Sequence, residues 1–235
     1  MQYLIDHHFE IIFKIFLVAI LFIGGAIVGW SRSRKRVDRI EQLRSFAVHR
    51  QWSFDPGPES YEEFVCPIPC RKRRKLISKP ENIIRGEIAG LDIAVFDDIL
   101  VRRDYQGVEN PEQQTVVAIR LSDLETQSII IKPKSQLHSS DQYKPIDLSP
   151  WPTLDKIFVM IAPEKSIAKV LLTPRLVGLL ETQPQHTLQL EGGWILFSAQ
   201  NCTAKVHEID LMIERLFDIA ELLVDTLPVD QSQSA

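Results

Sequence analysis

The chain has 235 residues, of which 45% are hydrophobic and 25% are charged, and its net charge is −4. This length leaves room for a membrane helix, a linker and one soluble domain of ordinary size. Four basic residues gather in positions 31–36 while the rest of the chain is acidic, and this argues against nucleic-acid binding, which needs many basic side chains facing phosphates. Three cysteines are too few for the disulfide framework of a small secreted domain.

Residues 11–30 form an apolar run that contains one charged residue, Lys14. A helix of this length spans roughly 30 Å, which matches the hydrocarbon core of a bilayer. A cleaved signal peptide is the weaker alternative, because the run is too long and the basic residues follow it instead of preceding it. The sequence therefore predicts a single transmembrane helix, preceded by a short outer segment, residues 1–10.

The charges on either side of this run predict its orientation. Asp6 and Glu10 precede it, and a basic collar follows it, consisting of Arg32, Arg34, Lys35 and Arg36. By the positive-inside rule, the N-terminus lies outside and the C-terminal part lies in the cytoplasm, at the inner membrane. Gly25 and Gly29 have the spacing that lets two membrane helices pack closely, so a dimer is one interpretation, and the general frequency of glycine in membrane helices is the other.

The collar leads into a segment with helical periodicity, so residues 31–52 are predicted to form a basic collar and a stalk helix. Residues 53–81 are predicted to be an irregular basic loop, because prolines and glycine interrupt every pattern there. The soluble domain is predicted to cover residues 82–228, and residues 229–235 are predicted to be a disordered tail.

Strands and helices alternate irregularly in the predicted domain. A hairpin is expected around Ala89-Gly90, and a second compact turn around Gly192-Gly193. Thr173-Pro174 has the residues that begin a helix, since the threonine oxygen caps free amides and proline needs no hydrogen bond there. Further strands are predicted at 114–121, 128–132 and 157–161, and a last helix at 206–223. This order predicts an α+β fold with a mostly antiparallel sheet and two or three amphipathic helices.

Several short segments give the chain a resemblance to a group of uncharacterised bacterial single-pass membrane proteins. They are Gln51-Trp52-Ser53-Phe54, Arg85-Gly86, Val95-Phe96-Asp97 and Gln114-Thr115-Val116-Val117, together with the N-terminal helix and its basic stop. The resemblance implies a membrane anchor and a cytoplasmic α+β domain, and it implies no activity.

Two groups of residues invite a chemical interpretation. Cys66, Cys70, Cys202 and His207 are ligands of the kinds that zinc prefers, although neither spacing is a zinc signature and ordinary thiols are the alternative. Asp97 and Asp98 are adjacent in a predicted strand, so they point to opposite faces and cannot act as one acid–base pair. We expect one of them to be exposed and the other to lie at a strand end or bulge.

A second basic cluster, Arg71, Lys72, Arg73, Arg74 and Lys75, lies in the predicted loop. Near a bilayer such a cluster attracts anionic lipids, and a solvated charged run is the alternative. The chain contains no recognisable catalytic or cofactor-binding motif. We therefore predict a membrane-tethered cytoplasmic module that needs no cofactor and binds the bilayer and another membrane protein or itself. A membrane-bound hydrolase or transferase and an anionic-lipid sensor are the alternatives.

Overall fold

The computed structural model describes residues 20, 24, 29–31, 33–57, 76–103, 109–121, 128–136, 145–199 and 202–226. The chain divides into two compact units, Met1–Ser45 and Phe46–Ala235. In the first unit, residues 29–31 and 33–45 are helical, and the helix continues to residue 49 of the second unit. We call residues 29–31 and 33–49 together the N-terminal helix.

No helix in these described ranges is both long and apolar enough to cross a membrane. Of the predicted transmembrane segment 11–30, they include Ile20, Gly24, Gly29 and Trp30. The other sixteen positions, Gly25 among them, lie outside the described residues, as do the predicted outer segment 1–10 and the predicted tail 229–235.

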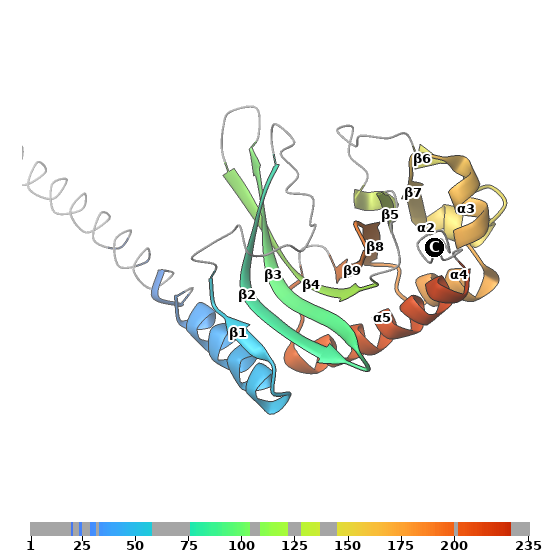
Figure 1. Cartoon of the computed structure of the whole chain (residues 1–235). Helices are drawn as coiled ribbons and strands as arrows, with labels where there is room; N and C mark the ends of the chain where they lie inside the picture. The colour runs from blue at the N-terminus through green and yellow to red at the C-terminus, as the bar shows by residue number, and fades with distance from the viewer. Residues whose placement is uncertain are drawn as a thin grey trace, which may run out of the picture. The chain divides into compact units, whose positions relative to one another are not determined.

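An antiparallel sheet dominates the described part of the second unit (Figure 1). It has nine strands in the order β1-β2-β3-β4-β9-β8-β5-β7-β6, and every neighbouring pair is antiparallel. The strands are β1 (Ser53–Asp55), β2 (Leu76–Ile88), β3 (Leu91–Arg103), β4 (Glu109–Arg120), β5 (Ile129–Pro133), β6 (Pro145–Ile146), β7 (Phe158–Ile161), β8 (His186–Glu191) and β9 (Trp194–Ala199). The predicted α+β class with an antiparallel sheet is confirmed.

Both predicted turns are present. Ala89 and Gly90 join β2 to β3 with φ angles of 53° and 82°, and Gly192 and Gly193 join β8 to β9 with φ angles of 54° and 78°. Positive φ at both central residues is the geometry that matches the twist of two antiparallel strands. β1 and the first residues of β2 fall in the segment predicted to be irregular, and β4 begins at Glu109, before the start of the predicted strand 114–121.

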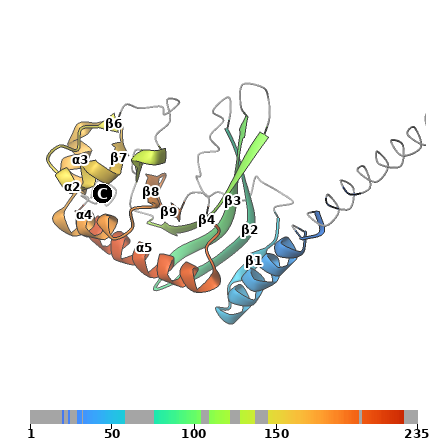
Figure 2. The same cartoon turned by 180° about the vertical axis from the view of Figure 1, so that it is seen from behind.

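The helices of the second unit are α2 (Pro152–Ile157), α3 (Lys165–Leu171), α4 (Pro174–Glu181) and α5 (Val206–Thr226). α5 packs against β4, β9, α3 and α4, and Figure 2 shows it from behind as one long helix running along the sheet. The Thr173 hydroxyl accepts a hydrogen bond from the Leu176 amide at 3.3 Å, which confirms the predicted start of α4. The short helices α2 and α3 were not predicted.

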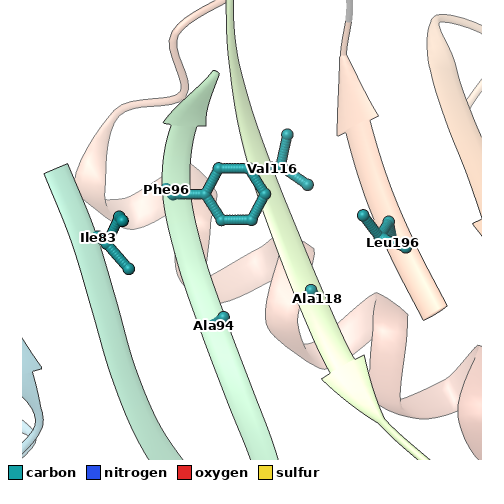
Figure 3. Packing of buried hydrophobic residues seen from close by; sticks show 6 residues of the cluster. All are labelled: Ile83, Ala94, Phe96, Val116, Ala118 and Leu196. Atoms are coloured by element: carbon teal, nitrogen blue, oxygen red, sulfur yellow. The ribbon is translucent and has the colours of Figure 1, made fainter. Parts of the chain in front are cut away.

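The central strands are buried on both faces. The even-numbered positions of β3 and β4 contribute to a cluster of Ile83, Ala94, Phe96, Val116, Ala118 and Leu196, against which Trp194 packs (Figure 3). On the other face of the same strands, Ile93, Val95, Val117 and Ile119 are also buried. This explains why these strands have continuous apolar runs instead of the alternation of a sheet with one wet face.

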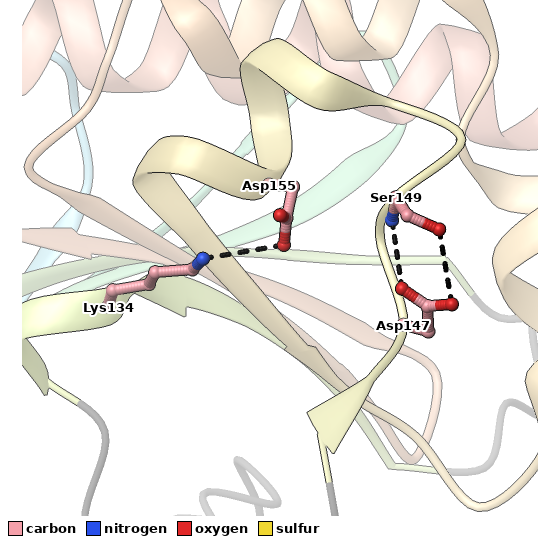
Figure 4. Close-up of polar contacts among 4 residues, drawn as sticks. All are labelled: Lys134, Asp147, Ser149 and Asp155. Carbon is pink, nitrogen blue, oxygen red and sulfur yellow. Dashed lines mark hydrogen bonds and ion pairs between the residues drawn. The ribbon is translucent and has the colours of Figure 1, made fainter.

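Polar contacts hold the chain before and within α2 (Figure 4). Asp147 accepts hydrogen bonds from the amide of Ser149 at 3.0 Å and from its hydroxyl at 3.1 Å. These two bonds favour the charged form and hold the pKa of Asp147 below its ordinary value. Lys134, in the 3-10 turn η1 (Lys134–Gln136), forms an ion pair with Asp155 of α2 at 3.4 Å.

Candidate functional site

The N-terminal helix ends at a junction with the sheet and α5. The amide of Gln51 donates to the carbonyl of Val48 at 3.1 Å, and the amide of Trp52 donates to the carbonyl of Ala47 at 2.8 Å. Gln51 adopts a positive φ of 59°. This pair of bonds closes a helix and reverses the chain, so Trp52 is turned back toward the sheet.

Trp52 lies directly on the backbone of β2 at Gly86. A Cβ atom at residue 86 would overlap the indole ring, so this strand position accepts no side chain. The ring also meets Phe46 edge to face, with centroids 6.1 Å apart. The junction is therefore an aromatic contact that depends on the absence of a side chain at one position of a strand.

Arg50 connects the same junction to α5. Its guanidinium lies 5.1 Å from the ring centroids of both Phe46 and Trp52, and it forms an ion pair with Asp210. Two aromatic faces and a carboxylate together hold a guanidinium in one orientation. The end of the N-terminal helix, β2 and the first turns of α5 are thus joined by four side chains, Phe46, Arg50, Trp52 and Asp210.

A second network surrounds Asp97, whose side chain is completely buried. Its two carboxylate oxygens accept hydrogen bonds from Asn82 Nδ2 at 3.0 Å and Thr115 Oγ1 at 2.8 Å. The Thr115 hydroxyl accepts a bond from the amide of Ala204 at 3.0 Å, and the Thr115 amide donates to the carbonyl of Cys202 at 3.1 Å. The network therefore fixes the chain that enters α5.

The burial of this pair corrects one expectation. Asp97 and Asp98 do point to opposite faces, because neighbours in a strand alternate, and Asp98 accepts a bond from Gln114 Nε2 at 3.3 Å. However, neither is exposed and neither lies at a strand end. The bulge lies in β2, around Asn82, which adopts a positive φ of 54° and presents its amide to Asp97. Burial on both faces of the sheet accounts for the difference.

The predicted zinc ligands are only partly described. Cys202 is an exposed free thiol, and His207, in the first turn of α5, has its Nε2 atom 3.9 Å from a carboxylate oxygen of Glu208. Cys66 and Cys70 lie outside the described residues. Within the described residues, no group of three or more His, Cys, Asp and Glu side chains could hold a metal ion.

Of the predicted membrane-surface residues, Arg34, Lys35 and Arg36 are exposed on the N-terminal helix. The guanidinium of Arg34 lies 5.8 Å from the ring centroid of Trp30. Arg32 and the second cluster, Arg71, Lys72, Arg73, Arg74 and Lys75, lie outside the described residues. Gly29 is one of the two predicted helix-contact glycines, and no atom of the described residues lies within 4 Å of the position that its Cβ atom would take.

The structural environment of two residues, Gly86 and His186, was not predicted from the sequence. Gly86 interrupts a strand pattern, and that is the signal which could have indicated a close approach of another group. His186 lies at the start of β8, stacked on Phe197 with centroids 4.5 Å apart, and its Nδ1 atom is buried and has no hydrogen-bond partner in the described structure. Burial lowers the pKa of His186 to about 4, because the charged imidazolium is poorly solvated there.

Comparison with known proteins identifies a shared fold. No protein-family model matches the chain, and no curated protein matches it. Among solved structures, the crystal structure of the mycobacterial trehalose monomycolate transport factor A, TtfA, matches with a TM-score of 0.56 and 16% sequence identity. The match covers 82% of this chain and 98% of that chain. At this identity, the chain is similar to the transport factor in its fold.

Proposed function

We propose that this protein is a membrane-associated accessory factor that binds another membrane protein in a transport or assembly system. The proposal depends mainly on the fold match. The match covers 98% of the transport factor, so the likeness extends beyond a single common motif. The apolar run at 11–30 and its basic collar support membrane association independently of that match.

The junction supports a tethered role for the domain. Phe46, Arg50 and Trp52 belong to the compact second unit, and they pack on β2 and α5. The chain therefore leaves the packed domain as a helix and not as a loose linker. A domain held close to the membrane meets other membrane proteins at a raised effective concentration, which favours a binding role.

The outer side of α5 offers a place to test this role. Leu211 is 56% exposed there, while Ile209, Met212 and Ile213 face the core. A photo-crosslinking amino acid at Leu211 in the full chain, expressed in its own cells, should form a crosslink to a multi-spanning membrane protein. Glu87, exposed in β2, gives a control position on another surface.

Membrane association is measured in the same cells by carbonate extraction. The proposal predicts that the protein stays in the membrane fraction and that a crosslink forms from position 211 more strongly than from position 87. A protein that carbonate removes, or one that forms no crosslink to a membrane protein from either position while still folded, would contradict the proposal.

A further inference from the structure

The N-terminal helix exposes apolar side chains on the side opposite to its buried one. Trp30 is 67% exposed and Val37 is 61% exposed, and they are seven positions apart, which places them on the same side of a helix. Leu43 is 1% exposed and lies on the other side of the same helix. The two exposed side chains therefore lie on a different side of the helix from the buried Leu43.

Arg34 lies between them on the same side. It is four residues after Trp30 and three before Val37, and its guanidinium is 5.8 Å from the Trp30 ring centroid. Lys35, next in the chain, is also exposed. An indole ring beside a cationic group, with an aliphatic side chain one turn further, is the composition favoured at the level of lipid headgroups.

We propose that Trp30, Arg34 and Val37 form a lipid-facing stripe that lies in the headgroup layer of a bilayer containing anionic phospholipids. The proposal rests on the membrane association proposed above and adds the side of the helix and the class of lipid. Trp30 and Val37 insert among the headgroups, and Arg34 with Lys35 supplies the attraction to anionic lipid, which acts within about 10 Å at 0.1 M salt.

A protein partner fits this stripe less well than a bilayer does. Three side chains cover a small area, whereas a stable protein interface buries about 800 Å² on each partner. The charge nearest Trp30 is basic, since Arg34 and Lys35 follow it within about two turns, whereas the acidic Asp38 and Glu41 lie beyond Val37. Anionic headgroups complement the basic end of the stripe, around Arg34 and Lys35, which is the end nearer the apolar run at 11–30.

The test uses the full chain, with Cys66, Cys70 and Cys202 replaced by serine and one new cysteine carrying a nitroxide spin label. Val37→Cys reports on the stripe, and Gln42→Cys is the matched control, because Gln42 is exposed on a different side of the helix. The protein is placed in nanodiscs of phosphatidylcholine, with and without phosphatidylglycerol. Collisions with oxygen, which partitions into lipid, and with a water-soluble nickel complex are then measured.

The expected result is an oxygen-to-nickel collision ratio several-fold higher at position 37 than at position 42. Phosphatidylglycerol should raise the ratio at position 37 further. Arg34→Ala combined with Lys35→Ala should remove that lipid-dependent increase and leave the value in pure phosphatidylcholine unchanged.

Three outcomes would overturn the inference. Equal ratios at positions 37 and 42 in both lipids would show that the stripe is not the lipid-facing side of the helix. Protection of position 37 from both reagents, with spin–spin broadening, would show a second copy of the chain covering it. A high ratio that ignores phosphatidylglycerol would remove the preference for anionic lipid. If the protein nevertheless stays in the membrane during carbonate extraction, only the lipid-facing stripe is refuted and the accessory role is unaffected. Release of the protein by carbonate would contradict both proposals.

Discussion

The contact between Trp52 and Gly86 gives the sharpest test of the junction. Gly86→Ala places a methyl group inside the indole ring, and the strand cannot move away easily, because β2 pairs with β1 at Arg85 and with β3 at Gly86 itself. Overpacking of this kind costs about 1–3 kcal/mol, and we expect the upper end, near 3 kcal/mol. For a domain of this size, that free energy corresponds to a melting temperature lower by roughly 6–12 °C.

A double-mutant cycle separates the overlap from other effects. Trp52→Ala alone should cost about 2–3 kcal/mol, less than for a fully buried tryptophan, because the ring is half-buried. In the Trp52→Ala background, Gly86→Ala has nothing to overlap and should cost nothing, or stabilise slightly through its lower conformational freedom. The free energies of unfolding are measured by urea titration of the detergent-solubilised chain. If the two single changes simply add, the overlap at Gly86 is not the cause and the account of the junction is wrong.

The remaining predictions concern single side chains. Thr115→Val should destabilise the fold by about 1–3 kcal/mol in thermal unfolding, because it removes the hydroxyl that bonds to Asp97 and to the Ala204 amide, whereas Thr115→Ser should be nearly neutral. Thr173→Ala should cost about 1 kcal/mol through loss of the α4 cap, and a helix unaffected in hydrogen exchange would argue against the cap. His186 has a folded pKa of about 4, below the 6.5 of the unfolded chain, so the unfolded state binds the proton first on acidification. The contribution of His186 to stability should therefore be full above pH 6.5 and fall by about 3 kcal/mol toward pH 4, so His186→Phe should reduce the loss of stability over this range, which an unchanged slope would contradict.

Local patterns predicted the turns and the sheet type well. Ala89-Gly90 and Gly192-Gly193 form the hairpin turns, because these pairs adopt the positive φ angles that the turns require. The strands that each turn joins are antiparallel. Prolines caused the errors at strand ends. Pro80 lies within β2 and Pro111 within β4. At these two positions the described strands pair on one side only, with β3, and no described strand pairs with the other side. Proline has no amide hydrogen to donate, and a side of the strand without a neighbour requires none. Proline is therefore tolerated at these positions of the strand.

The candidate site was harder to predict, because its contacts join distant parts of the chain. Arg50 meets Asp210 across 160 positions, and Thr115 meets Ala204 across 89. Neither contact produces a periodic pattern in the sequence from which it could be predicted. The buried state of Asp98 was also hidden, since it depends on the second face of the sheet being covered, and alternation along a strand reports only which residues share a face.

These two distant contacts act on the same element. The Asp97 network fixes Ala204, just before α5, and Arg50 holds Asp210, in its second turn. The start of α5 is therefore fixed both by the central strands and by the end of the N-terminal helix. Because Leu211 lies directly after Asp210 and faces outward, the surface at which we test partner binding is presented by a turn that the junction itself holds. A partner on that surface would contact a helix whose second turn is held by Arg50, and this links the junction to the proposed accessory role.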